Sequence, residues 1–202
     1  IGLIRELCAY AGGGGSLEQR RLVLITLGVM MSLFMASMES TVIATAMPTI
    51  VTQLGGLESY SWVFAIYMLT STTVGPIFGK LSDIYGRRPI YMIAIATFTV
   101  GSLLCGLATT MPQLIAARAV QGLGAGGLMP LAFIIVGDIF TIEQRARVQG
   151  LFSGVWGVSS VIGPLVGGFL VDRASWQWVF LINLPAAAVA AALVWVAWSG
   201  VA

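Results

Sequence analysis

The sequence predicts an all-α transmembrane protein built as one bundle of six helices. Three observations lead to this fold class. The chain carries 10 Lys and Arg and 8 Asp and Glu, or 9% of its 202 residues, against about 25% in an ordinary soluble domain. Hydrophobic residues make up 58%, and the mean hydropathy is +0.95. A soluble protein could not cover its surface with so few charges, and a net charge of +2 does not suit a nucleic-acid partner.

Six apolar runs are long enough to cross a bilayer, which takes about 20 residues of helix. Helix is the expected form, because in lipid every backbone polar group must be satisfied within the segment. The membrane domain is residues 17–202, and its runs cover residues 22–50, 60–80, 90–109, 113–137, 148–171 and 178–199. Residues 1–16 form a tail. Its Gly-Gly-Gly-Gly-Ser stretch is either an artificial tag and linker or a natural glycine-rich segment.

Basic residues separate the runs and set their orientation. They precede the first run, lie between the second and third, and lie between the fourth and fifth, whereas the opposite connections carry only Arg173. Both termini are therefore expected in the cytoplasm. The chain stops just after the sixth run, which suggests a truncated protein. The basic residues on the cytoplasmic side are Arg20, Arg21, Lys80, Arg87, Arg88, Arg145 and Arg147.

The connection between the second and third runs is a short basic hairpin with the sequence G-K-L-S-D-I-Y-G-R-R-P, residues 79–89. Composition alone indicates a tight cytoplasmic turn. Its spacing resembles the signature loop of the major facilitator superfamily, G-x-L-a-D-r-x-G-r-R/K. We expect the hairpin to act as a cytoplasmic gate that holds one access state. Its gate residues are Gly79, Asp83, Gly86, Arg87 and Arg88, with Lys80 beside them.

Four further stretches resemble motifs of the same superfamily. In the fourth run, R-A-V-Q-G-L-G-A-G resembles R-x-x-q-G-x-g-a-a and assigns Arg118, Gln121 and Gly122 to the cavity. Residues 176–185, W-Q-W-V-F-L-I-N-L-P, resemble the W-R-W-x-F-x-I-N-x-P of drug:proton antiporters, with Gln177 where Arg is usual. Residues 38–43, M-E-S-T-V-I, resemble the L-D-x-T-I-V of fourteen-span drug antiporters, with Glu39 in place of Asp.

The fifth run is rich in glycine and resembles the antiporter element G-x-x-x-G-P-x-x-G-G. Proline removes a helical hydrogen bond, so a bend that shapes the transport route is one expectation. Close packing of small residues between helices is the alternative. The residues of this motif are Gly157, Gly163, Pro164, Gly167 and Gly168.

Glu39 is the only carboxylate in the middle of a run, and Arg118 is the only base inside one. An ionisable residue inside a membrane is costly and marks a functional site by default. We expect Glu39 to take and release the coupling proton and Arg118 to tune it. The alternatives are a static buried pair, a snorkelling Glu39, and an Arg118 that ties backbone carbonyls. The face of the first run that carries Glu39, with Ser32 and Ala46, is expected to border a cavity.

The resemblance implies the N-terminal half of a major facilitator fold, whose two six-helix halves enclose the substrate near the midplane. The implied function is proton-coupled efflux of lipophilic or cationic drugs by alternating access, driven by the proton gradient without a cofactor or metal. The expected partners are a small lipophilic substrate, membrane lipids, and the C-terminal half or a second copy. The expected location is the cell membrane, in a bacterium the inner membrane.

Enzyme activity is not expected. The chain has no His and no Walker loop, and its G-L-G-A-G stretch lies in an apolar run rather than after a strand. Two alternatives to drug efflux stay open. One is antiport of another solute, such as a lipid or metabolite, and the other is a non-transporting membrane fragment that serves as a scaffold.

Overall fold

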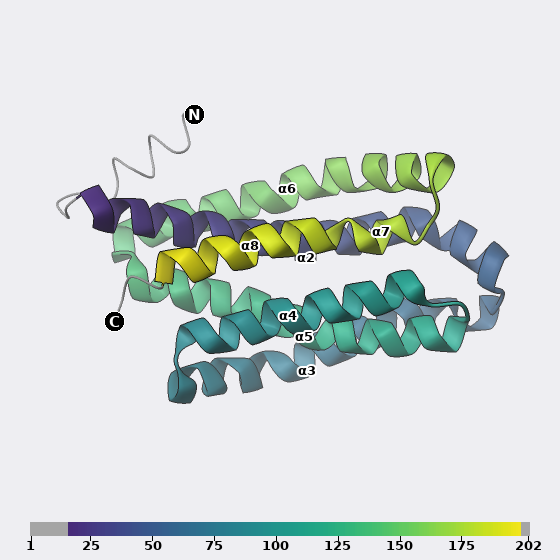
Figure 1. The fold of residues 1–202 in the computed structure, drawn as a ribbon, viewed down its shortest axis with the longest axis horizontal. Helices are drawn as coiled ribbons and strands as arrows, with labels where there is room; N and C mark the ends of the chain where they lie inside the picture. The colour runs from purple at the N-terminus through teal and green to yellow at the C-terminus, as the bar shows by residue number, and fades with distance from the viewer. Residues whose placement is uncertain (1–15, 199–202) are drawn as a thin grey trace.

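The computed structural model describes residues 16–198, and within that range every regular element is helical (Figure 1). Six of the described segments are long and apolar enough to cross a membrane, which confirms the predicted all-α six-span fold. Residues 1–15 of the predicted tail 1–16, and the last residues, 199–202, lie outside the described part. The elements are α2 Ser16–Leu54, the 3-10 helix η1 Leu57–Ser59, α3 Tyr60–Tyr85, α4 Arg87–Leu107, α5 Met111–Ile139, α6 Ile142–Arg173, α7 Trp178–Leu181 and α8 Asn183–Trp198.

The sixth span, expected as one run over residues 178–199, is divided into α7 and α8 at Ile182. The sequence explains the division, because Pro185 has no N–H to donate to the carbonyl of Leu181 four residues earlier. Asn183 therefore begins a new helix shortly after the start of the span at Trp178. The α6 helix, in contrast, runs without interruption through Pro164.

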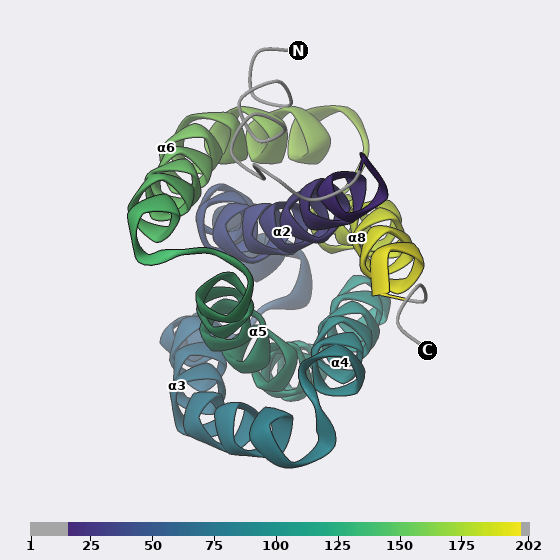
Figure 2. The same ribbon diagram turned by 90° about the vertical axis from the view of Figure 1, so that its left-hand side faces the viewer.

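The helices form two groups of three (Figure 2). In one group α2 packs between α6 and α8, and in the other α5 packs between α3 and α4. The start of α2 and the α3–α4 and α5–α6 connections lie together at the left of Figure 1. We call this the basic end, because it carries Arg20, Arg21, Lys80, Arg87, Arg88, Arg145 and Arg147.

Glycines allow α5 to approach its two neighbours closely. A Cβ on Gly124 would collide with the backbone of Phe98 on α4, and a Cβ on Gly126 would collide with the backbone of Ser71 on α3. From the other side, Gly101 of α4 leaves room for the backbone of Gln121. Small residues at such contacts drive helix association in lipid, where burial of apolar surface contributes little.

The substitution Gly124→Ala is therefore expected to destabilise the protein, by about 1–3 kcal/mol, since overpacking forces backbone shifts. A matched control is Gly137→Ala, because no atom lies within 4 Å of a Cβ built at Gly137 in the same helix. Thermal unfolding of the two purified variants checks this. Equal midpoints would contradict the close α4–α5 contact.

Two hydrophobic clusters fill the bundle, one towards each end of the helices. The cluster at the basic end includes Val29, Phe98 and Leu128. The cluster at the opposite end includes Met47, Leu114 and Phe180. Between them lies a layer of buried polar side chains from four helices, which we call the polar layer: Glu39, Ser102, Arg118, Gln121 and Asn183.

Candidate functional site

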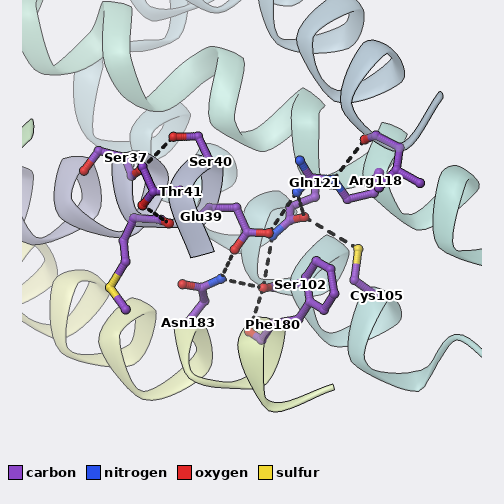
Figure 3. Close-up of polar contacts among 12 residues, drawn as sticks. Ser37, Glu39, Ser40, Thr41, Ser102, Cys105, Arg118, Gln121, Phe180 and Asn183 are labelled. Atoms are coloured by element: carbon purple, nitrogen blue, oxygen red, sulfur yellow. Dashed lines mark hydrogen bonds and ion pairs between the residues drawn. The ribbon is translucent and has the colours of Figure 1, made fainter. Parts of the chain in front are cut away.

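The polar layer holds the two charges that sequence analysis singled out. Arg118 Nη1 donates to Glu39 Oε1 at 2.8 Å, and the two side chains are 1% and 0% exposed (Figure 3). The same Nη1 donates to Gln121 Oε1 at 2.7 Å. The structure thus brings together α2 and α5 through a fully buried ion pair. Its geometry fits either a proton site tuned by arginine or a static pair.

Arg118 is also fastened to α3. Its Nε donates to the backbone carbonyl of Val63 at 3.3 Å. Its guanidinium carbon lies 4.0 Å from the centroid of the Tyr67 ring, which is a favourable cation–π distance. The expectation that Arg118 ties a backbone carbonyl and the expectation that it faces Glu39 both describe the observed contacts. Sequence reasoning did not identify Tyr67.

The second carboxylate oxygen of Glu39 faces α8 and α4. Asn183 Nδ2 donates to Glu39 Oε2 at 2.5 Å and to Ser102 Oγ at 3.0 Å (Figure 3). Because a carboxylate can only accept, Asn183 must present its N–H group here. Ser102 Oγ also accepts from Gln121 Nε2 at 3.1 Å and donates to the carbonyl of Phe180 at 2.9 Å. The layer therefore joins α2, α4, α5 and the α7–α8 junction.

Sequence reasoning missed Ser102 and gave Asn183 no role. Asn183 carried a usable signal, because it lies in the recognised W-x-W-x-F-x-I-N-x-P stretch as a polar residue within an apolar run. Ser102 carried no such signal, because it does not stand out from the other hydroxyl residues of its helix. Two of these, Thr97 and Thr99, only donate to carbonyls four residues earlier. Cys105 donates from Sγ to Gln121 Oε1 at 3.5 Å.

The expectation that the Glu39 face of α2 borders a cavity is wrong for most of its length. Ser32, Ile43 and Ala46 are each 0% exposed, because this face packs against the other helices of the bundle. Glu39 is thus aimed into the interior of the six-helix unit.

The chemistry of the layer follows from its burial. Taking a carboxylate and a guanidinium out of water costs several kcal/mol per ion, and the two charges repay this only while they are paired and hydrogen-bonded. Desolvation favours a neutral Glu39, whereas Arg118 favours the carboxylate. The described residues hold no group of three side chains suited to a metal ion.

The basic hairpin forms its own cluster of contacts. Arg87 Nη1 pairs with Asp83 Oδ1 at 2.5 Å, and Arg87 Nε pairs with Asp138 Oδ2 on α5 at 2.8 Å. Gly86 has φ +92°, which favours glycine, and so fixes the turn between α3 and α4. Arg88 lies over the Trp195 ring of α8, 4.3 Å from its centroid.

Two other hairpin residues have smaller parts. Gly79 has only an ordinary contact, since a Cβ there would lie 3.9 Å from Ile134. Lys80 is exposed. The hairpin therefore links α3, α4, α5 and α8 within this one bundle.

The glycine motif of α6 divides into two parts. A Cβ on Gly163 would collide with Thr41, and one on Gly167 would collide with Thr45, so these two glycines pack closely on α2. Gly157 and Gly168 face open space, with no atom within 4 Å of a Cβ. Pro164 is exposed. Close packing of small residues thus accounts for the first pair of glycines and leaves the second pair unexplained.

A groove between α2, α5 and α6 has a volume of about 470 Å³. Three of its seven lining residues are aromatic, and two of these, Phe133 and Phe152, meet edge to face with centroids 5.6 Å apart. Trp156 is 45% exposed beside them. The full lining is Leu33, Met129, Phe133, Gln149, Phe152, Ser153 and Trp156.

The sequence matches one protein-family model and several curated transporters. The family model described as Major Facilitator Superfamily matches residues 29–200. The multidrug transporter protein MdtP of Bacillus subtilis is 47% identical over 173 residues, which are 86% of this chain and 32% of the relative. Multidrug resistance protein 3 of the same organism is 47% identical over 161 residues, 80% of this chain and 31% of the relative. The chain thus spans about a third of the length of these curated relatives.

Comparison with solved structures supports the fold. A D-xylose-proton symporter superposes with a TM-score of 0.72 at 18% identity, over 85% of this chain and 47% of the symporter. The human organic anion transporter MFSD10 superposes with a TM-score of 0.71 at 16% identity, over 91% of this chain and 48% of the transporter. At such low identity the match concerns the fold alone.

Proposed function

The chain belongs to the major facilitator superfamily, and from this premise we propose that it works as the N-terminal half of a proton-coupled efflux transporter for lipophilic or cationic drugs. Two relatives of 47% identity carry multidrug names, and the efflux pump FUS6 of Gibberella moniliformis is 40% identical over 174 residues. These names support efflux as the type of transport. The proton as the coupling ion is supported by the site itself.

The observation that carries the proposal is the buried Glu39–Arg118 pair. A carboxylate in the centre of a membrane bundle has two stable conditions, paired with a cation or protonated. When Glu39 takes a proton, the net charge of the polar layer rises by one unit. A cationic substrate that binds nearby would disfavour that extra charge and promote proton release. The proton and the cationic substrate then replace each other at the site, as antiport requires.

The groove supports a lipophilic substrate. Its three aromatic side chains and its two polar side chains, Gln149 and Ser153, suit a planar compound with a hydrogen-bonding group. Aromatic faces also attract organic cations. None of the lining residues is charged. We place part of the substrate site here, with the remainder supplied by the other half of the transporter or a second copy of this one.

The basic end is proposed to face the cytoplasm, with both ends of the membrane domain on that side. The positive-inside distribution of Lys and Arg supports this orientation. The energy source is the proton gradient, so no cofactor is required. The location follows as the cell membrane, among its lipids. The 47% identity to the two Bacillus subtilis proteins supports a bacterial membrane, which is the inner membrane in our proposal.

The hairpin is proposed to hold one access state, and Asp83→Asn tests this. The ion pair is exposed, with the Asp83 side chain 55% accessible, so its loss should change the unfolding free energy by less than about 1 kcal/mol. Transport should nevertheless fall several-fold, because the gate closes less well. Glu58→Gln, an exposed carboxylate outside the hairpin, is the control. Transport equal to that of the control would contradict the proposed gate.

The proposal as a whole is tested with the full-length protein reconstituted in liposomes. An imposed proton gradient should drive accumulation of a lipophilic cation, and collapse of the gradient should abolish it. Inhibition by chemically unrelated cations would support a multidrug substrate range. Inhibition only by one lipid or metabolite class would assign the chain to another antiporter. Absence of any gradient-driven flux would leave a non-transporting membrane domain.

A further inference from the structure

Glu39 meets two different kinds of partner on its two oxygens. Oε1 faces the guanidinium of Arg118, a cation that can only donate. Oε2 faces the neutral amide of Asn183. A proton taken up by the carboxylate is repelled from the cationic side, so it is placed on Oε2. The acid then points its new O–H at Asn183.

Ser102 has no spare hydrogen-bonding capacity while Glu39 is a carboxylate. Its Oγ accepts from Asn183 Nδ2 and Gln121 Nε2, and its O–H donates to the carbonyl of Phe180. A hydroxyl has one donor and two acceptor positions, so each of them is occupied. Any new partner for Ser102 must replace an existing one.

We infer that Asn183 and Ser102 are positioning residues that relay the protonation of Glu39 to the α7–α8 junction. This inference rests on the proposed role of Glu39. The new O–H on Oε2 meets the N–H of Asn183, and two donors cannot bond. The amide therefore rotates by a half turn and accepts through Oδ1. That oxygen now also faces Ser102, whose O–H turns towards it and leaves the carbonyl of Phe180.

The relay conserves protons and moves only one. The proton on Glu39 comes from water, and the later steps are rotations of an amide and a hydroxyl. Their consequence is the loss of one hydrogen bond, from Ser102 to Phe180. Phe180 is 0% exposed, and without Ser102 its carbonyl keeps, in the described part of the chain, only the N–H of Ile182, which is shared with the carbonyl of Trp178. The loss of the Ser102 bond is therefore costly unless the backbone around Phe180 moves.

The α7–α8 junction is suited to respond. The α7 helix has four residues, and Ile182 separates it from α8. Pro185 leaves the Leu181 carbonyl without a helical donor. The Ser102–Phe180 bond fastens this segment to α4, next to the close packing of Leu181 on Gly106. Its release lets the sixth span change shape at the depth of the proton site.

Few other ionisable groups act on Glu39. Arg118 approaches from α5 and Tyr67 from α3, and Cys105 lies on α4. Tyr67 and Cys105 interact with the charge of Glu39, but within residues 16–198 their contacts are with Arg118 and Gln121. The α8 helix has no charged residue. Asn183 is thus the neutral group that must respond when Oε2 changes from acceptor to donor.

The test is hydrogen–deuterium exchange of peptides covering residues 178–184 in the full-length protein at one fixed pH. Glu39→Gln imitates the protonated acid, because its amide N–H can face Asn183. Exchange at the junction should then be about tenfold faster, the effect of losing one buried hydrogen bond. In a Ser102→Ala background the exchange should be fast with either residue at position 39. In an Asn183→Leu background it should be slow with either, since leucine cannot turn Ser102 away from Phe180.

The control is Ser37→Ala, which removes another buried serine, bonded to Ser159 rather than to the polar layer. In that background Glu39→Gln should retain its tenfold effect. A junction unaffected by Glu39→Gln, or an effect that persists in either the Ser102→Ala or the Asn183→Leu background, overturns the relay. Failure of the proposed function is a separate result, because it would appear as undiminished proton-driven flux in Glu39→Gln, whatever the exchange at the junction.

Discussion

Proton-driven drug efflux is expected to disappear in the Glu39→Gln variant. Glutamine keeps the length and the hydrogen-bonding capacity of the side chain but has no proton to exchange. Uptake of a lipophilic cation into liposomes with an imposed pH gradient should fall to the level of protein-free liposomes. Binding of the cation should persist, because the groove at α2, α5 and α6 is unchanged, but at lower affinity, because the substitution removes the negative charge of Glu39. Flux and binding measured on one preparation check both parts.

Two control variants sharpen this result. Glu39→Asp retains a carboxylate that is one methylene shorter, and it should retain gradient-driven transport at a reduced rate. Glu58→Gln removes an exposed carboxylate and should transport as the original protein does. Undiminished exchange by Glu39→Gln would exclude this residue as the coupling site and leave the pair with Arg118 as a structural contact.

Arg118→Met is expected to be the most destabilising substitution in the polar layer. It leaves the Glu39 carboxylate buried without its cation, and breaking a buried pair from one side costs about 3–5 kcal/mol. It also removes the contacts to Val63 and Tyr67 that fasten α3. A large decrease in the thermal unfolding midpoint, or loss of the folded protein on expression, is the expected result.

The double variant Glu39→Gln with Arg118→Met separates charge from packing. It removes both ions, so much of the lost stability should return relative to Arg118→Met alone. Lower pH should also stabilise the single variant, because protonation of Glu39 removes the unpaired charge. If the double variant were as unstable as the single one, the packing of Arg118 and not its charge would explain the loss.

The membrane fold could be predicted from the sequence because its signals are additive over many residues. Six long apolar runs and the scarcity of charges were sufficient for the number and type of elements. The lone charges in the runs pointed to Glu39 and Arg118. Their direct contact needed the structure, because sequence positions alone do not show which helix faces meet.

The remainder of the site depends on packing that leaves little trace in one sequence. Ser102 looks like any small polar residue of an apolar run, and only the approach of α8 gives it Asn183 and Phe180 as partners. The break at Ile182 follows from a proline three residues later, an effect that a hydropathy profile does not display. The glycines of α6 look alike in sequence, yet Gly163 faces α2 and Gly157 faces open space.

The central claim is that Glu39 releases a proton when a drug binds. Release is measured directly by adding a lipophilic cation to the weakly buffered, detergent-solubilised full-length protein with a pH indicator. The account predicts acidification that saturates with drug binding in the original protein and is absent from Glu39→Gln, although both bind the drug. Drug binding without acidification in the original protein, or equal acidification in the two proteins, would contradict it.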